Sequence, residues 1–217
     1  MFEAEKDKYL MKHGFGATRL KAVLFDMDGV LFDSMPNHAY SWSHAMTQFG
    51  LHITPEEAYM HEGRTGGGTI DLLAQRDWGR RATEEEKQTI YKAKSDVFSR
   101  CPEAPRMPGA YELLKKVKAD GFTPMVVTGS GQDRLNHNFP SVFRRDLMVT
   151  SFDVKYGKPN PEPYLMGLQK AGIQPWEGLV VENAPLGVQA GVSAGIFTIA
   201  VNTGPLPDKV LIDAGAD

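Results

Sequence analysis

The sequence has little of what would direct the chain to a membrane, to the cell exterior or to nucleic acid. Cys101 is its only cysteine, so no disulfide can form within the chain, as is usual in a reducing cytosol. No apolar run approaches the length of a transmembrane helix, and residues 1–19 mix acids and bases without the apolar centre of a secretory signal. With 24 basic and 27 acidic side chains the formal net charge is -3, which gives no general attraction to nucleic acids or acidic membranes. We therefore expect a cytoplasmic protein without nucleic-acid or membrane partners. These features do not determine the oligomeric state, and a monomer is our expectation.

The sequence also lacks internal repeats and low-complexity tracts, and one stretch, residues 22–31 (AVLFDMDGVL), organises the remainder. An apolar run of strand length leads into Asp26 and Asp28 and stops at Gly29. Side chains at positions i and i+2 of a strand share a face, so both carboxylates are expected on one side where the strand ends. Two such charges about 4 Å apart repel by about 4 kcal/mol at an effective dielectric constant of about 20. A cation or a raised pKa on one acid must compensate, and a metal-assisted phosphoryl-transfer site would use both. The alternative is an ordinary turn with two solvated acids.

Beyond residue 105, apolar strand patterns alternate with helical patterns. Strands are expected at 123–127, 147–150, 178–181 and 197–201, and helices at 110–119, 160–171 and 185–194. Alternation of this kind predicts parallel strands in a doubly wound α/β sheet, whose ligands bind at the carboxyl ends of the strands.

Residues 36–105, by contrast, carry helical patterns only. A first helix contains Trp42 and Ala45 at helical spacing, and others are expected at 55–61, 69–75 and 83–100, before a linker rich in proline. We therefore expect a core domain formed by residues 20–35 and 106–217, with an all-α cap domain inserted at 36–105. Residues 1–19 are expected to be an N-terminal extension outside the fold, in which residues 3–13 either form a short helix or are disordered.

Residues suited to phosphate binding follow the later strands. Thr128 closes the strand at 123–127 with a hydroxyl, and the Gly129 amide beside it can donate to a phosphoryl oxygen. Lys158 precedes a proline, whose ring disfavours helical geometry at the lysine and holds it extended. Glu182 and Asn183 end the strand at 178–181. Taken singly, Thr128 and Lys158 have ordinary explanations, a strand-to-helix turn and a surface charge.

Taken in order, residues 26–30 (DMDGV), Thr128, Lys158 and the Glu182-Asn183 pair resemble the four-motif signature of the haloacid dehalogenase (HAD) superfamily. The resemblance extends from residue 20 to about the C-terminus. Within the superfamily the chain is similar to the β-phosphoglucomutase-like branch, and in particular to bacterial inorganic pyrophosphatases of the HAD type. A lone DxD is common, whereas four motifs in order, each at a strand end, are specific. The connection between Ser130 and Pro140 is shorter than this family leads us to expect.

The resemblance implies a catalytic role for four residues. Asp26 would be the nucleophile and would form an aspartyl-phosphate. Asp28 would be the acid and base of the reaction, with a pKa near the operating pH. Thr128, with the Gly129 amide, would hold the phosphoryl oxygens, and Lys158 would neutralise the phosphate and the charge on Asp26.

The resemblance also implies a Mg²⁺ site. Its ligands would be Asp26, the backbone carbonyl of Asp28, Glu182 and Asn183, since Mg²⁺ prefers oxygen ligands and retains several waters. Family members often carry two acids where this chain has Glu182 and Asn183. An amide oxygen supplies no charge, so we expect weaker Mg²⁺ binding than in a relative with two acids.

In the cap, the resemblance assigns substrate contacts to His38, Arg64 and Lys94, with Trp42 as packing. From residue type alone, the three would be solvated surface residues and Trp42 a core residue. Glu62 departs from the mutase-type pattern, in which we expect an apolar residue. A small, highly charged, metal-complexed anion such as pyrophosphate could use Glu62 through a metal ion or a water, with Arg64 and Lys94 on the distal phosphate. The alternative for Glu62 is a solvated loop acid.

We therefore expect a Mg²⁺-dependent phosphohydrolase that acts on a small phosphate compound, with pyrophosphate favoured. Core motifs specify the reaction, and the cap specifies the substrate because its closure supplies the outer wall and expels water. The main alternative is a β-phosphoglucomutase or sugar-phosphate phosphatase built on the same core. A further alternative, which is not an enzyme, is a phosphate-binding regulatory protein. The presence of both Asp26 and Asp28 argues against it.

Overall fold

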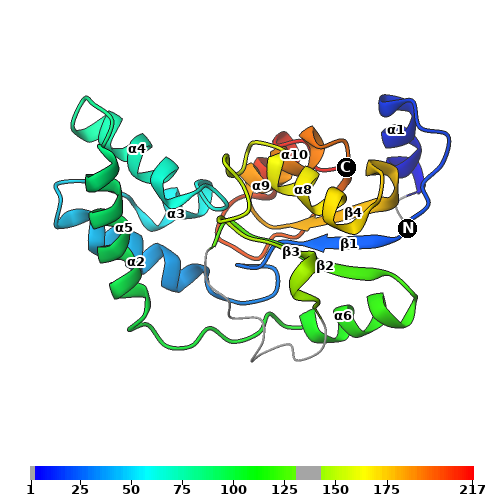
Figure 1. Ribbon diagram of the computed structural model, residues 1–217, viewed down its shortest axis with the longest axis horizontal. Coiled ribbons are helices and arrows are strands. Elements are labelled where there is room, and N and C mark those ends of the chain that lie inside the picture. The colour runs from blue at the N-terminus through cyan, green and yellow to red at the C-terminus, as the bar shows by residue number, and fades with distance from the viewer. Residues whose placement is uncertain (1–2, 131–142) are drawn as a thin grey trace.

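The computed structural model describes residues 3–130 and 143–217, and a five-stranded parallel sheet lies at its centre (Figure 1). The strand order is β3-β2-β1-β4-β5, and each neighbouring pair is parallel. The strands are β1 (Ala22–Phe25), β2 (Thr123–Val127), β3 (Met148–Val149), β4 (Gly178–Glu182) and β5 (Phe197–Ala200). This confirms the expected doubly wound α/β architecture.

The two faces of the sheet are covered by different helices, α6 on one side and α8 with α9 on the other (Figure 1). Val23 and Phe25 of β1 pack with residues of α6 (Ala110–Ala119), whereas Leu24 packs with residues of α8 (Glu162–Ala171) and α9 (Pro185–Ser193). Alternate side chains of one buried strand therefore serve two hydrophobic layers, which explains why β1 is apolar throughout.

The sheet register gathers the motif residues at one edge. Phe25 pairs with Val126 on β2 and with Val181 on β4. Because the strands run in the same direction, the residues that follow these three positions emerge side by side. Asp26 continues the ladder, since its backbone N–H donates to the carbonyl of Val181 at 3.0 Å.

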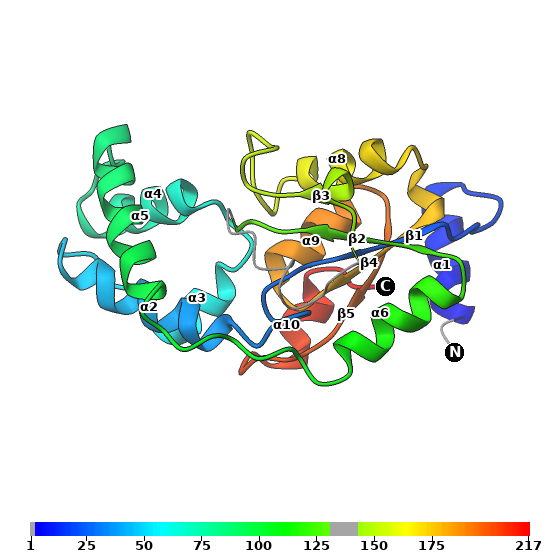
Figure 2. The ribbon, with the colours of Figure 1, turned by 60° about the horizontal axis from the view of Figure 1, so that its bottom comes forward.

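Four helices, α2 to α5, stand together at one end of the molecule (Figures 1 and 2). They are α2 (Met35–Thr47), α3 (Pro55–Met60), α4 (Gly66–Asp77) and α5 (Glu84–Phe98), and they share a hydrophobic cluster of their own. This cluster matches the predicted all-α insertion, while the domain limits at residues 36 and 105 stay a prediction.

Several boundaries differ from the sequence expectation. The helix α4 begins three residues earlier than predicted, within a run of glycines, because the Thr65 side chain accepts a hydrogen bond from the Gly68 amide and caps it. The strand β3 has two residues, since a 3₁₀ turn at Arg145–Leu147 takes up the start of the predicted segment. A further helix, α10 (Asp208–Asp213), follows β5. The short 130–140 connection falls mostly in residues 131–142, outside the described part of the chain.

The N-terminal helix α1 (Glu3–His13) forms as predicted, but it does not lie outside the fold. Tyr9 is 1% exposed and donates its hydroxyl to the carbonyl of Gly195 at 2.8 Å. Phe15 packs against Trp176. The expectation of a detached segment is therefore wrong, because a few aromatic side chains fasten a helix that is otherwise charged. Figure 1 shows α1 at the end of the molecule opposite α2 to α5.

Within residues 3–130 and 143–217, no helix combines the length and the apolar character needed to cross a membrane.

Candidate active site

Five motif residues are almost completely buried where β1, β2 and β4 end. Asp26 is 4% exposed, Thr128 3%, Lys158 1%, Glu182 1% and Asn183 6%. So many polar groups in a nearly dry place are tolerated only when they satisfy one another or await a ligand. Their mutual contacts therefore indicate what the site is built to hold.

Lys158 lies at the centre of the buried cluster. Its ammonium is 2.5 Å from Asp26 Oδ1, 2.6 Å from Glu182 Oε1 and 3.1 Å from the carbonyl of Val127. Burial would lower the pKa of Lys158, but the two carboxylates outweigh it and raise that pKa. Burial raises the pKa of Asp26 to about 8, and the Lys158 ammonium opposes this rise. The close contact between the Lys158 ammonium and Asp26 Oδ1 is the arrangement that neutralisation of Asp26 by Lys158 requires.

Glu182 is engaged by the protein on both oxygens. Oε1 accepts from Lys158 and from the Tyr164 hydroxyl at 2.7 Å, while Oε2 accepts from the amides of Asn183 and Ala184 at 3.0 and 3.3 Å. The carboxyl group also fills the space beside Gly187, where an added Cβ would lie 1.8 Å from Oε1. The oxygens of Glu182 therefore already accept from four donors, and its role as a metal ligand stays a prediction. Tyr164 was not among the predicted site residues.

Asp28 is held by Ser34, which directly precedes α2, and by His38 of α2, and Lys94 of α5 contacts His38 in turn. The Ser34 hydroxyl donates to Asp28 Oδ1 at 2.6 Å, and His38 Nε2 lies 3.2 Å from the same oxygen. His38 Nδ1 is in turn 2.9 Å from the ammonium of Lys94. Burial would raise the pKa of Asp28, but His38, Ser34 and Lys94 outweigh it and lower the pKa to about 2. The expectation of an Asp28 pKa near the operating pH is therefore wrong for this arrangement.

Lys94 is buried, although its residue type alone favours solvent. It is 4% exposed, and its ammonium lies 4.5 Å from the centre of the Phe98 ring and 5.4 Å from that of Trp42. Aromatic faces attract a cation electrostatically, so these rings replace part of its lost hydration. The predicted packing role of Trp42 is consistent with this contact. Lys94 is therefore a buried pocket-lining residue and not a surface charge, and its contact with substrate stays a prediction.

Glu62, in the loop between α3 and α4, reaches the core site. Its Oε2 accepts from the side-chain amide of Asn183 at 3.1 Å, and Asn183 itself lies against Gly29. Burial, and then the charges of Asp26, Glu182 and Asp28, raise the pKa of Glu62 well above its usual value. The alternative of a solvated loop acid is therefore excluded for this conformation.

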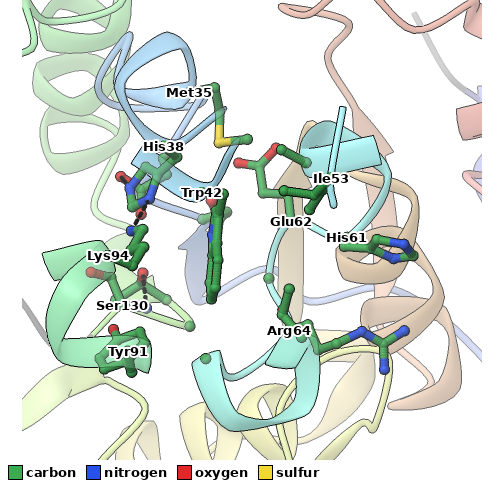
Figure 3. A pocket seen from close by; sticks show the side chains of 18 residues that line it. Met35, His38, Trp42, Ile53, His61, Glu62, Arg64, Tyr91, Lys94 and Ser130 are labelled. Carbon is green, nitrogen blue, oxygen red and sulfur yellow. Dashed lines mark hydrogen bonds and ion pairs between the residues drawn. The ribbon is translucent and has the colours of Figure 1, made fainter. Parts of the chain in front are cut away.

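A pocket lies between the strand ends and the helices α2 to α5. Figure 3 shows His38, Lys94 and Tyr91 on one side of it and Glu62 and Arg64 on the other. In this view the Arg64 guanidinium points away from Lys94, and its buried Nε has no partner. The predicted residues Asp26, Asp28, Thr128 and Gly129 also line the pocket, whereas Lys158, Glu182 and Asn183 do not.

Sequence reasoning missed several lining residues, namely Met35, Ile53, Ala58, His61, Thr69, Tyr91 and Ser130. Most are apolar or neutral and carry no chemical signal in the sequence. His61 is the one titratable imidazole among these missed residues, and its Nδ1 is buried without a hydrogen-bond partner. Burial, and then Arg64, lower the pKa of His61.

The donor set fits a hard cation. In residues 3–130 and 143–217, no three His, Cys, Asp or Glu side chains form a ready metal site. However, Asn183 Oδ1 and Glu62 Oε1 are both buried without a hydrogen-bond partner, and the Asp26 carboxylate interacts electrostatically with Glu62. Unpaired buried oxygens beside several acids are costly unless a cation or a donor completes them. Asp26, Asn183 and Glu62 are therefore the side chains that could hold Mg²⁺.

Comparison with known proteins agrees with this geometry. A family model described as haloacid dehalogenase-like hydrolase matches residues 23–201. Hexitol phosphatase A of Escherichia coli is 34% identical over 189 residues, which are 85% of this chain and 84% of that protein. A phosphorylated carbohydrates phosphatase of Thermotoga maritima is 31% identical over 91% of this chain and 92% of its own length. A solved structure from Bacteroides vulgatus, provisionally described as a β-phosphoglucomutase, is 65% identical with a TM-score of 0.97, covering 99% of this chain and 89% of that one. The chain therefore belongs to the family of haloacid dehalogenase-like hydrolases, in its phosphatase and β-phosphoglucomutase-like branch.

Proposed function

We propose that this protein hydrolyses a small phosphate compound, inorganic pyrophosphate first, with Asp26 as nucleophile and Mg²⁺ as cofactor. The observation that carries the proposal is the buried contact between Glu62 and Asn183. It introduces an additional carboxylate from the cap side into the core site, beside Asp26. A compact, highly charged anion held through a metal ion benefits from such a group, whereas a neutral sugar does not.

The chemistry begins at Asp26. Its carboxylate attacks phosphorus and forms an aspartyl-phosphate, so that one difficult displacement becomes two easier ones. Thr128 and the Gly129 amide line the pocket and would donate to the oxygens of the transferring group. Lys158 neutralises charge on Asp26 and on the phosphoryl group, and the bound Mg²⁺ would supply further charge neutralisation.

Asp28 favours a substrate with a good leaving group. With its pKa at about 2, the Asp28 carboxyl is ionised at neutral pH and can accept a proton more readily than it can donate one. In this ionised state it can accept a hydrogen bond from the water that cleaves the aspartyl-phosphate and orient it, although its low pKa makes it a weak base. Phosphate leaves from pyrophosphate as a much weaker base than a sugar alkoxide leaves from an ester. The anhydride therefore depends less on a proton from Asp28.

The size of the pocket also favours a compact substrate. The centre of a water molecule can move through about 60 Å³ of it, which is room for a few waters or a small anion. Lys94 and Arg64 line this space and would meet the distal phosphate, with Arg64 turning inward to do so.

The test is a comparison of kcat/KM, with Mg²⁺, for pyrophosphate, β-glucose 1-phosphate and several sugar phosphates. We expect pyrophosphate to give the largest value in the wild type. Glu62→Ala should lower kcat/KM for pyrophosphate by at least about tenfold. Glu56→Ala, which removes an exposed acid of α3, is the matched control and should have no effect. The substrate assignment is wrong if the esters are hydrolysed as well as pyrophosphate or if Glu62→Ala leaves its rate unchanged.

A second candidate is a sugar-phosphate phosphatase or β-phosphoglucomutase. It is favoured by the names of the relatives, two of which are phosphatases of phosphorylated sugars or sugar alcohols. It is also favoured by His38 and Lys94, which face the pocket and would contact a sugar. Turnover of β-glucose 1-phosphate to glucose 6-phosphate, or of a hexose phosphate faster than pyrophosphate, would establish it. A phosphate-binding regulator is the remaining alternative, and it requires that the whole panel give no turnover.

A further inference from the structure

We propose that Tyr164 is a positioning residue, whose hydroxyl fixes Glu182 and thereby holds the ammonium of Lys158 against the nucleophile Asp26. The inference rests on the proposed phosphoryl-transfer function and adds a residue to it. Tyr164 belongs to α8, is 0% exposed, and donates to Glu182 Oε1 at 2.7 Å. It does not line the pocket, so it acts on the substrate only through its neighbours.

The contacts of Lys158 show why its position depends on Glu182. An ammonium has three protons to donate, and Lys158 directs them to Asp26, Glu182 and the carbonyl of Val127. The Tyr164 ring also packs against the Lys158 ammonium, with its centre 5.1 Å from the nitrogen. Each of these partners fixes one direction, so the charge is held at one point beside Asp26 Oδ1.

The contacts of Glu182 show what Tyr164 adds. Oε2 is fixed by two backbone amides, of Asn183 and Ala184, which cannot move without the chain. Oε1 is shared by the Lys158 ammonium and the Tyr164 hydroxyl. Without the hydroxyl, the flexible lysine would be the remaining partner of Oε1, and the carboxylate could follow it away from Asp26.

The hydroxyl has no packing purpose. A phenylalanine would fill the same space without the free-energy cost of burying a hydroxyl, which is repaid only by a hydrogen bond. The bond made is to a carboxylate in a region that also holds Asp26, Asp28 and Glu62. By taking part of the charge of Glu182, the hydroxyl leaves more of the Lys158 charge for Asp26 and for the phosphoryl group.

The experiment compares Tyr164→Phe with Tyr9→Phe. Tyr9, in α1, is the matched control, since it is 1% exposed and donates its hydroxyl to the carbonyl of Gly195 at 2.8 Å. Figure 1 shows α1 at the end of the molecule away from the helices α2 to α5 that border the pocket. The rates are measured on pyrophosphate or, where the wild type does not hydrolyse it, on the best phosphate ester of the panel. Calorimetry of Mg²⁺ binding supplies a readout that is independent of activity.

Tyr164→Phe should lower kcat by about 10–100-fold, with KM and the Mg²⁺ dissociation constant within about twofold of the wild type. Tyr9→Phe should lower thermal stability to a similar extent and leave kcat unchanged. Glu182→Gln, a second variant with the same shape, should repeat the loss of kcat without weakening Mg²⁺ binding.

Three results would overturn the proposal: an unchanged kcat in Tyr164→Phe, an equal loss of kcat in Tyr9→Phe, or Mg²⁺ binding that weakens in proportion to kcat. The last result would place Glu182 on the metal. A wild type that hydrolyses esters but not pyrophosphate would refute the substrate assignment alone and leave this test intact.

Discussion

At the scale of single residues, the two acids of the DMDGV motif have opposite environments. Burial raises the pKa of Asp26 to about 8, while contacts with His38, Ser34 and Lys94 lower that of Asp28 to about 2 against the effect of burial. Two carboxylates with separated pKa values can take different parts in one reaction. The sequence argument anticipated that a cation and a raised pKa would both compensate the repulsion. It placed the pKa of Asp28 near the operating pH, because no motif shows that the fold brings Ser34, His38 and Lys94 to this carboxylate.

The affinity for Mg²⁺ should rise with pH. A pKa of about 8 means that Asp26 is protonated below that pH in the metal-free protein, whereas a metal ion requires the carboxylate. Apparent affinity should therefore fall by up to about tenfold for each pH unit below 8 and level off above it. Calorimetric titration with Mg²⁺ at pH 6, 7, 8 and 9 measures this. The same affinity at pH 6 and pH 8 would contradict the proposed ligand role of Asp26.

Asn183→Asp should bind Mg²⁺ several-fold more tightly than the wild type. The substitution adds a charge at an oxygen that is buried without a partner, and ligand charge increases cation affinity. Gln75→Glu, which adds the same charge at an exposed position of α4, is the control. Should Asn183→Asp bind Mg²⁺ no more tightly, the assignment of Asn183 to the metal site fails.

Whether a residue's place in the site could be predicted depended on whether it belonged to a sequence motif. Asp26, Thr128 and Lys158 were found because they follow strands in a recognisable order. A lysine is normally predicted to be exposed to solvent. Lys94, however, lies four residues from both Ile90 and Phe98, which are buried on the same face of α5. Tyr164 has the same kind of signal, since Leu168 lies four residues on and both are buried in α8. Neither spacing reveals that a polar group will be needed there.

At the scale of elements, the backbone of the loop between α3 and α4 lies very close to the backbone of the core. A Cβ added to Gly129 would lie 2.8 Å from the carbonyl oxygen of Gly63, and one added to Gly157 would lie 2.8 Å from the backbone nitrogen of Thr65. Close backbone approach of this kind requires glycine. It is this approach that allows the neighbouring Glu62 to reach Asn183.

Gly157→Ala should therefore keep the fold and lose activity. The new methyl group would press against the backbone at Thr65 and push the α3–α4 loop away from the strand ends, which should lower kcat/KM for pyrophosphate by about 10–100-fold. Gly67→Ala is the control, because the nearest atom to its new Cβ would be a carbon of the flexible Lys87 side chain, at an ordinary contact distance of 3.6 Å. Equal activity in the two variants would show that the close approach is not needed for turnover.

Elements with a strong hydrophobic period were predicted with the correct type and order, and β1, β2 and β4 place the site as expected. The start of α4 was missed because its three glycines disfavour a helix, whereas the Thr65 cap and the packing of Ile70 and Leu73 outweigh that preference. The loop conformation that brings Glu62 into the site depends on long-range contacts. It could not be derived from local sequence.

At the scale of the whole molecule, the helices α2 to α5 and the sheet are joined at the pocket by contacts that carry the proposed chemistry. His38 and Lys94 come from these helices and Asp28 from the end of β1, and together they form one hydrogen-bonded chain. Tyr59 of α3 packs on Gly204, where an added Cβ would lie 3.0 Å from the ring. Movement of the four helices would therefore change the environment of both Asp28 and Glu62.

The helix α1 should contribute to stability and not to turnover. Tyr9→Ala removes a buried aromatic ring between α1 and the core, which should lower the free energy of unfolding by about 3–5 kcal/mol and leave kcat unchanged. Met11→Ala, at a position 78% exposed in the same helix, should have little effect. Urea denaturation measures both. A Tyr9→Ala variant as stable as Met11→Ala would mean that α1 is not docked in solution.

The most direct test of the central claim is the rate of pyrophosphate hydrolysis by Asp26→Asn beside that of Asp33→Asn, which changes an exposed acid a few residues away. Asparagine keeps the shape of the side chain but has no carboxylate, so it cannot form the acyl phosphate. The account predicts that Asp26→Asn is slower than the wild type by at least about 10³-fold, with Asp33→Asn at the wild-type rate. Hydrolysis by Asp26→Asn at the wild-type rate would contradict it.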